Sequence, residues 1–331
     1  MVTFRTTPND LLTDADARRG GVVATVRLAN PSRRPSTGGG RQVELRLPEE
    51  IEAIRASALI ARAAVDAALR CAVAGALPSS LAAVVAGVIA SERAESVIQS
   101  PSFDELDAGA RTFPAACCIA VNDRLIHAVP TDVPLRDGDL VTVDVAVRLR
   151  GWCADIADCV VVGTGTCERH AIVTGCHEML DAAVATIAPG VRWSTVARAM
   201  QDVAASRSLG LVTGYAGHGV GRALHEAPIA PCAIDREFET RGDFTLLPDM
   251  VLSVEPTVVQ HPDGIRCVDA DGFAIGVQFV EGDDGWTMRT ASGAAGCSVE
   301  RTVVVTRTGC EMLDEARASI SSPEGHDTNH G

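Results

Sequence analysis

The sequence predicts an α+β fold of two similar halves around one sheet, and the order of its patterns carries that prediction. Apolar residues recur at helical spacing over 51–65, and two more helical stretches lie near 167–187 and 193–208. Short β-prone runs precede those two stretches and return after them, at 250–259 and 298–306. This order along the chain, in which two helices lie between two groups of strands, favours a sheet covered by helices.

The predicted globular part opens with a helix. Pro48 is followed by Glu49 and Glu50, and a proline with acids in the first turn is typical of a helix N-terminus. Ala-rich helices continue to about Glu95, with a break near Pro78. Three β-prone runs then follow, at residues 118–121, 140–148 and 159–162.

Composition and charge exclude several classes of protein. The chain has 331 residues, of which 47% are hydrophobic, so it can bury a sizeable core and is not disordered throughout. Its 29 basic and 43 acidic residues give a net charge of −14, which argues against nucleic acid or an anionic membrane as the main partner. All the basic residues are Arg, so Schiff-base chemistry and a P-loop lysine are excluded.

The cysteines predict a reducing compartment. Eleven cysteines, an odd number without a C-x-x-C pair, indicate neither a disulfide framework nor a zinc ribbon, so we expect a cytoplasmic protein. The first thirty residues lack the apolar core of a signal peptide, and the Arg-rich start carries three Asp, which disfavours a transit peptide. The longest apolar stretch, Leu81 to Ala90, is about half a membrane span, so we expect no membrane partner.

Three segments are expected along the chain. Residues 1–41 hold seven Arg, three Asp and the run Gly38 to Gly40, which indicates a flexible basic extension. Residues 42–317 form the predicted folded domain, without an obvious linker. Residues 318–331 read as a polar tail.

Two carboxylates occupy sequence that is otherwise apolar or strand-like. Asp144 lies in the run 141–147, and Asp155 follows eleven residues later, beyond a turn. A hairpin centred between Leu149 and Arg150 sets the two directly opposite each other on one face, where like charges repel and a cation would relieve the repulsion. The alternative is a solvent-facing strand with ordinary acids, and a register error of one residue would move one Asp to the other face.

A glycine-rich segment, residues 217–226, carries two histidines seven residues apart. His218 lies between glycines that allow a close backbone approach, and His225 precedes an acid. By itself a glycine-flanked histidine is more often a turn residue than a metal ligand. The spacing is not H-E-x-x-H, so a helical zinc-protease site is excluded.

Two glutamates interrupt β-prone runs further along. Glu255 ends an apolar run and precedes Pro256, which favours an extended backbone. Glu300 interrupts the run 299–305, and each glutamate has the alternative of an ordinary acid paired with an arginine such as Arg301. Four carboxylates and one histidine in core-like sequence are explained more simply as one oxygen-rich metal site.

Taken together, these motifs resemble those of type I methionine aminopeptidases over residues 44–315. The matching segments occur in the family's order: Cys118 to Asn122, His127 to Pro130, Asp144, Asp155, Gly217 to Pro228, Val254 to Pro256, Asp284 to Thr287 and Glu300. The resemblance implies the pita-bread fold, with two pseudo-symmetric halves around a curved, mainly antiparallel sheet and helices outside. It also implies hydrolysis of the first peptide bond of nascent chains, which releases the N-terminal methionine.

The resemblance implies a site for two divalent metal ions, which would be Co, Mn, Fe or Zn. Asp144, Asp155 and Glu300 would hold one ion. The other would be held by Asp155, His218, Glu255 and Glu300. An activated hydroxide would attack the peptide carbonyl, and Glu255 would take the proton from the nucleophilic water.

The resemblance also assigns substrate-binding residues. His127 and His225 would donate hydrogen bonds to the scissile amide and the tetrahedral intermediate. A small apolar pocket for the methionine side chain would be lined by Phe113, Cys118, Leu224 and Trp286. Ala110 replaces an aromatic residue common at that position, which would widen the pocket.

Two other functions remain alternatives. The first is an Xaa-Pro-type aminopeptidase of the same fold, disfavoured by the segment 217–228 and by a short N-terminal region without room for the extra domain of such enzymes. The second is a catalytically silent relative that binds ribosomes or nucleic acid. Residues 1–41 carry the charge for ribosome docking, whereas no sequence-specific nucleic-acid binding is expected.

Overall fold

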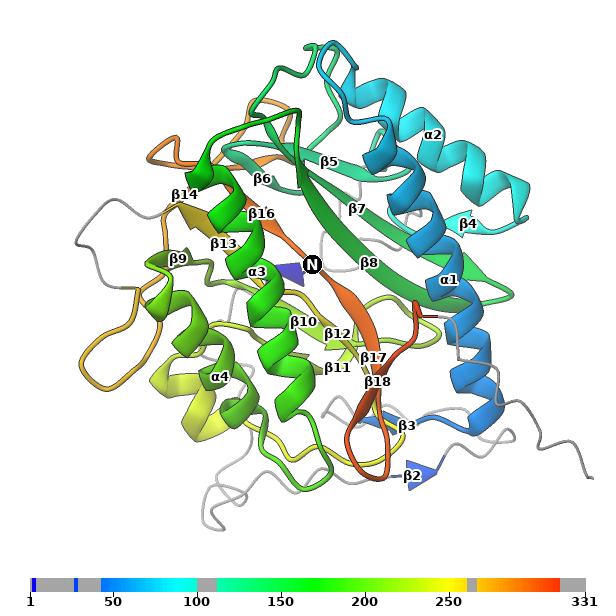
Figure 1. Ribbon diagram of the computed structural model, residues 1–331. Helices are drawn as coiled ribbons and strands as arrows, with labels where there is room; N and C mark the ends of the chain where they lie inside the picture. The colour runs from blue at the N-terminus through cyan, green and yellow to red at the C-terminus, as the bar shows by residue number, and fades with distance from the viewer. Residues whose placement is uncertain (1, 4–26, 29–42, 100–111, 261–266, 316–331) are drawn as a thin grey trace, which may run out of the picture.

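The computed structural model describes residues 2–3, 27–28, 43–99, 112–260 and 267–315. Its helices pack on the outside of antiparallel sheets in two halves (Figure 1). Most of residues 1–41, all of 318–331 and the pocket position Ala110 lie outside the described part, so the predicted extension and tail stay predictions. No described helix is long and apolar enough to cross a membrane.

Two long helices cover each half. The first pair is α1 (Pro48–Arg70) and α2 (Pro78–Ser91), and the second is α3 (Cys167–Thr186) and α4 (Trp193–Ser206). A short π-helical turn, η1 (Phe238–Gly242), follows later in the chain. The predicted start at Pro48 is confirmed, and the Glu50 carboxylate accepts a 3.0 Å hydrogen bond from the Leu47 amide there. The helices end before the predicted Glu95, because Glu95 and Ser96 pair with a strand instead.

The first half is a seven-stranded antiparallel sheet under α1. Its long central hairpin is β7 (Leu140–Leu149) and β8 (Trp152–Val161), and α1 packs on both strands. The remaining strands are β4 (Glu95–Ser96), β5 (Cys118–Val121), β6 (Arg124–Ile126), β14 (Phe279–Glu281) and β15 (Met288–Thr290). On the edge of β7 opposite β8, two shorter strands, β4 and β5, pair with different parts of β7.

The second half contains a six-stranded and a three-stranded sheet. The six strands are β1 (Val2–Thr3), β10 (Tyr215–Gly219), β11 (Glu226–Ala230), β12 (Val251–Val254), β17 (Arg301–Val305) and β18 (Cys310–Met312). The three are β9 (Leu209–Leu211), β13 (Thr257–Gln260) and β16 (Gly296–Ser298), on which α3 packs. A short parallel pair, β2 (Arg27–Leu28) and β3 (Glu44–Leu45), completes the described strands.

Both runs that were predicted as single strands are split at a glutamate. The run 250–259 divides at Glu255 and Pro256 into β12 and β13, which belong to different sheets. The run 298–306 divides at Val299 and Glu300 into β16 and β17. Pro256 has no amide hydrogen for a ladder, which accounts for the first break. An isolated bridge between Ala157 and Glu300 joins the two halves at the second break.

The register of the central hairpin differs from the prediction by two residues. Asp144 pairs with Ala157, and Asp155 pairs with Ala146. The turn consists of Arg150 and Gly151, whose φ angles of 51° and 81° are both positive, as type I′ hairpins require. Because the shift is an even number of residues, the two aspartates remain on one face as diagonal neighbours.

Candidate metal centre

The structure brings the five predicted metal ligands together from five segments. Asp144 is on β7, Asp155 on β8 and His218 on β10, whereas Glu255 directly follows β12 and Glu300 directly precedes β17. One ligand atom each of Asp155, His218 and Glu300 lies within 4.8 Å of the other two. Glu255 Oε1 lies 3.8 Å from His218 Nε2. The strand breaks therefore place both glutamates beside the face that carries the aspartates.

Burial makes this concentration of negative charge costly. Burial raises the pKa of all four carboxyl groups, to about 8 for Asp144 and to about 7 for Glu255. Repulsion from Asp155 adds to the rise at Asp144, Glu255 and Glu300. Asp144 keeps partial exposure and the other three are buried. A metal-free site therefore holds protons that divalent cations would displace.

Arginine does not neutralise the cluster. Within the described residues, no arginine forms an ion pair with any of the four carboxylates. Arg301, next to Glu300 in sequence, instead pairs with Asp158 at 2.7 Å and with Asp314 at 3.0 Å. The alternative of an ordinary strand-edge acid paired with Arg301 is thus wrong for Glu300.

His218 is held in the tautomer that a metal ligand needs. Its Nδ1 lies 3.0 Å from the carbonyl oxygen of Gly219, which only accepts, so Nδ1 carries the hydrogen and Nε2 presents a lone pair. Burial lowers its pKa to about 3, so the ring is neutral. Four buried acceptor atoms here have no hydrogen-bond partner among the described residues: His218 Nε2, Asp155 Oδ1 and both oxygens of Glu255. Buried acceptor atoms that lack a hydrogen-bond donor fit a bound cation.

The glycines around His218 are required by close backbone packing. A Cβ at Gly217 would lie 2.3 Å from the Ser253 carbonyl oxygen, and one at Gly219 would lie 2.2 Å from that of Ala227. Both contacts are too short for any side chain, so the predicted close approach is confirmed. The packing brings β10 against its neighbours and sets His218 among the carboxylates.

Two hydroxyl residues position the ligands, and the sequence reasoning missed both. Ser253 donates a short hydrogen bond to Glu300 Oε1. The Thr302 hydroxyl accepts from the Asp155 amide at 3.0 Å and donates to the Asp155 carbonyl at 2.9 Å. A serine in an otherwise apolar strand is a usable signal for Ser253. Thr302 carries none, because threonine is common in strands.

The two predicted substrate-facing histidines lie beside β10. The His225 ring packs edge-on against His218, with centroids 4.5 Å apart. The His127 ring packs edge-on against Tyr215 at 6.1 Å. His127 has φ of 49°, a left-handed conformation that costs free energy in a residue with a side chain and that clusters at functional sites. Tyr215, the only tyrosine of the chain, was not predicted.

The four predicted pocket residues belong to one apolar cluster. Phe113, Cys118 and Leu224 are buried in it, and the partly buried Trp286 packs against it. The rings of Phe113 and Trp286 meet edge-on at 5.4 Å. Cys118 pairs with Asp144 across β5 and β7, so this cluster reaches the metal-binding face.

Clustered carboxylates with a neutral imidazole, buried on the strands of this two-halved scaffold, define a metal-dependent hydrolase. The model of metallopeptidase family M24 matches residues 52–307, so the chain belongs to that family.

Several curated relatives are named methionine aminopeptidase. The chain is 36% identical to a methionine aminopeptidase of Treponema pallidum over 203 residues, which cover 61% of this chain and 73% of that protein. It is 32% identical to methionine aminopeptidase 1 of Mycobacterium tuberculosis over 282 residues, covering 83% of this chain and 96% of that protein.

Solved structures confirm the pita-bread fold. A methionine aminopeptidase from Thermotoga maritima superposes with a TM-score of 0.71 at 25% identity, covering 83% of this chain and all of that one. A prolidase from Pyrococcus furiosus superposes with a TM-score of 0.60 at 22% identity, covering 83% of this chain and 66% of that one. The prolidase thus shares the fold.

Proposed function

We propose that this chain is a methionine aminopeptidase, a metal-dependent hydrolase that releases the N-terminal methionine from nascent polypeptides. The observation that carries the proposal is the convergence of Asp155, His218 and Glu300 within 4.8 Å of one another, with Glu255 beside them. The match to family M24 and the curated relatives named methionine aminopeptidase support the same activity.

Two divalent cations fit the site by charge. Four carboxylates supply about four negative charges, which balance two divalent ions. Asp144, Asp155 and Glu300 would hold one ion. Asp155, His218, Glu255 and Glu300 would hold the other. When bound, such ions polarise a carbonyl and lower the pKa of water.

The chain's own side chains supply the remaining chemistry. No described residue donates a hydrogen bond to either oxygen of Glu255, so this carboxylate can accept the proton of the attacking water. His127 and His225 would donate hydrogen bonds to the scissile amide and to the oxyanion. The apolar cluster of Phe113, Cys118, Leu224 and Trp286 would hold the methionine side chain.

The edge of β10 supports a peptide as the substrate. Val2 and Thr3 pair antiparallel with Ala216 and Tyr215, so an extended segment can add to this strand. Ala216 is two residues before His218 on the same strand. A peptide backbone that took the place of Val2 and Thr3 would therefore lie two residues from His218 along β10.

Substrate preference tests the proposal directly. The metal-loaded enzyme should release methionine from Met-Ala-Ser and leave Ala-Pro-Ala nearly untouched. Preference for Ala-Pro-Ala would instead establish the Xaa-Pro alternative, and turnover of neither peptide would favour the silent relative. Chelation followed by reloading with Co, Mn, Fe or Zn, with elemental analysis of each sample, would identify the active metal and its stoichiometry.

The basic extension is proposed to dock on the ribosome, where nascent N-termini emerge. The seven Arg in residues 1–41 contrast with the net charge of −14 of the whole chain. Deleting residues 1–41 should abolish co-sedimentation with ribosomes and leave tripeptide hydrolysis intact. Unchanged sedimentation would contradict docking.

A cytoplasmic location is also proposed, because none of the eleven cysteines forms a disulfide, as is usual for proteins of a reducing compartment.

A further inference from the structure

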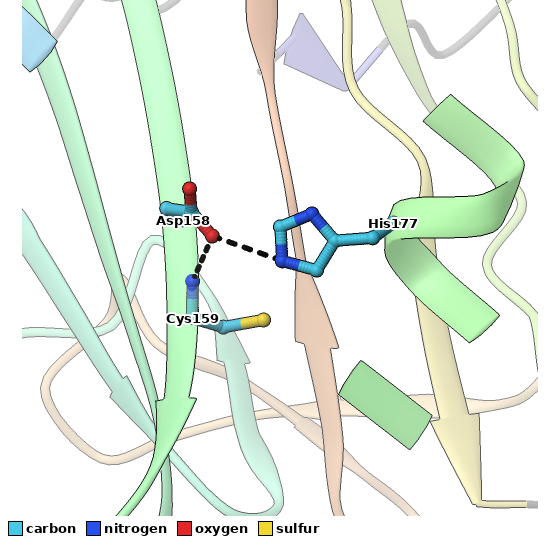
Figure 2. Close-up of side chains that lie close together, drawn as sticks. All are labelled: Asp158, Cys159 and His177. Carbon is cyan, nitrogen blue, oxygen red and sulfur yellow. Dashed lines mark hydrogen bonds and ion pairs between the residues drawn. The ribbon is translucent and has the colours of Figure 1, made fainter. Parts of the chain in front are cut away.

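A second cluster of metal-binding side chains lies between β8 and α3, apart from the five catalytic ligands. Asp158 and Cys159 are consecutive on β8, and the His177 imidazole projects from α3 toward them (Figure 2). One ligand atom of each residue lies within 4.8 Å of the other two. Asp158 and Cys159 are largely buried, whereas the His177 side chain is 37% exposed. The cluster is therefore pre-assembled and open on one side.

The spacing of the donor atoms fits a tetrahedral ion. His177 Nε2 lies 3.2 Å from Asp158 Oδ1. A hydrogen bond between an imidazolium and a carboxylate is usually about 2.7 to 2.9 Å long. Two ligands that are each about 2.0 to 2.1 Å from a tetrahedral zinc ion lie about 3.3 Å apart. The observed separation thus accommodates two ligands of one ion as well as the hydrogen bond of the metal-free protein.

The donor set also suits zinc. A thiolate, an imidazole and a carboxylate are the three ligand types that zinc takes from proteins, and three protein ligands leave a fourth position for water. The exposed side of His177 gives that position access to solvent. Hard cations such as magnesium and calcium prefer oxygen ligands alone, so the Cys159 thiolate discriminates against them.

Neighbouring groups orient the cluster and favour the ionised forms of Asp158 and Cys159. Arg62 and Arg301 both donate to Asp158 Oδ2, at 2.8 Å and 2.7 Å, which leaves Oδ1 toward His177. Burial opposes ionisation of Asp158, yet His177 and Arg301 hold its pKa below the usual range. A hydrogen bond from the Cys297 thiol lowers the pKa of Cys159. Supporting contacts of this kind are typical of metal sites.

In the metal-free protein a proton takes the place of the cation. Hydrogen bonds to Asp158 and Cys159 raise the pKa of His177 to about 10, so the imidazolium lies beside the Asp158 carboxylate. A zinc ion that displaces this proton would compensate the charge of Asp158 and of the Cys159 thiolate that forms on binding. Zinc binding at neutral pH is therefore expected to release a proton.

We propose that Asp158, Cys159 and His177 form a separate zinc site that cross-links β8 to α3. Because β8 carries Asp155 and belongs to the first half while α3 packs on the second, a bound ion would fasten the two halves together. The site does not rest on the proposed peptidase activity.

Cobalt substitution separates this site from the catalytic cluster. The full chain, stripped of metal and loaded with Co(II), should show a thiolate-to-cobalt charge-transfer band in the near ultraviolet. The Cys159→Ser and His177→Ala variants should lose this band and about one bound cobalt. His218→Ala, which alters only the catalytic cluster, should keep the band. A wild-type protein without the band, or a band that persists in Cys159→Ser, would overturn the proposal.

A second measurement distinguishes loss of the zinc site from misfolding of a variant. His177→Gln removes a partly exposed side chain, so its fold should survive, as circular dichroism would show. Zinc should raise the melting temperature of the wild type above that of His177→Gln under conditions in which the catalytic cluster is filled with manganese. An equal rise in both proteins would contradict the site, whether or not the enzyme hydrolyses Met-Ala-Ser.

Discussion

Glu255 is buried, and neither of its carboxylate oxygens has a hydrogen-bond partner in the part of the chain that the structure describes, so its charge calls for a cation. An isolated buried charge is costly, and the usual escape is protonation. The raised pKa of Glu255, about 7, has this cause. The metal-free site is thus a set of carboxyl groups that hold protons near neutral pH, and metal loading is a competition with those protons.

Glu255→Gln should separate stability from activity. The amide has nearly the same shape but carries no charge, so the metal-free protein should melt at a higher temperature at pH 8. Metal-induced stabilisation should shrink because a ligand is lost, and hydrolysis of Met-Ala-Ser should disappear because the proton acceptor is lost. Thermal denaturation with and without metal, beside a peptide assay, measures all three. Normal turnover would contradict the assignment.

The two neighbouring histidines should behave differently when truncated. His218→Ala removes the lone pair that faces the carboxylates, so bound metal and turnover should both fall sharply. His225→Ala removes a ring that packs against His218 and is not one of the five predicted ligands, so turnover should fall while metal is retained. Metal content by elemental analysis and kcat on one tripeptide distinguish the two. Full activity in either variant would refute its role.

At the scale of the element, the central hairpin and its neighbours show which local sequence signals are enough to place a helix or strand. The positions of β5, β7, α3 and α4 agree with the predicted runs to within two residues, because periodicity and strand propensity are properties of a short segment. The turn at Arg150 and Gly151 was misplaced, since which two residues form a type I′ turn depends on the pairing of both strands. The splits at Glu255 and Glu300 were missed because strands on either side join different sheets.

The close packing of strand β10 against its neighbours requires its glycines, which the hydrophobic periodicity of the sequence does not indicate. Gly217→Ala would place a methyl group 2.3 Å from the Ser253 carbonyl, so β10 and β12 would have to separate. We expect a loss of about 1 to 3 kcal/mol in unfolding free energy, with weaker metal binding. Urea unfolding of the metal-free and metal-loaded variant measures both effects.

Gly87 provides the matched control. It lies within α2, and a Cβ there would meet nothing within 4 Å. Gly87→Ala should therefore raise the unfolding free energy by about 0.5 to 1 kcal/mol and leave metal binding unchanged. Equal effects at the two positions would show that the close packing of β10 is not the cause.

At the scale of the whole molecule, the candidate metal site lies where the two halves meet. Asp144 and Asp155 come from the seven-stranded sheet, whereas His218, Glu255 and Glu300 come from segments of the second half. The bridge between Ala157 and Glu300 and the hydrogen bonds of Thr302 to Asp155 cross the same boundary. A bound cation would thus contribute to the association of the halves as well as to catalysis.

The pH dependence of the metal-free protein follows from the same cluster. Folding raises the pKa of these carboxyl groups above the unfolded values, so the folded state binds more protons and its stability falls as pH rises. The loss should extend from about pH 4.5, the unfolded value of Glu255, through the folded values near 7 and 8. Melting temperatures in chelator from pH 5 to 9 measure it.

Two comparisons test whether the carboxylate cluster causes this fall of stability with rising pH. Divalent metal should restore stability most strongly at the alkaline end, where the carboxylates are free of protons. Glu255→Gln in chelator should show a shallower fall than the wild type, because one of the titrating groups is gone. A slope unaffected by the substitution would assign the pH dependence to groups elsewhere.

The sequence by itself determined which side chains were candidates for the site, because aspartate, glutamate and glycine are conspicuous in apolar strands. It also determined the helices and the single-face placement of the aspartates. Only the tertiary structure decided the partners: Ser253 for Glu300, Thr302 for Asp155, and Asp158 rather than Glu300 for Arg301. Those contacts join residues far apart in sequence, and no local pattern encodes a hydrogen bond between segments that meet only when the sheets assemble.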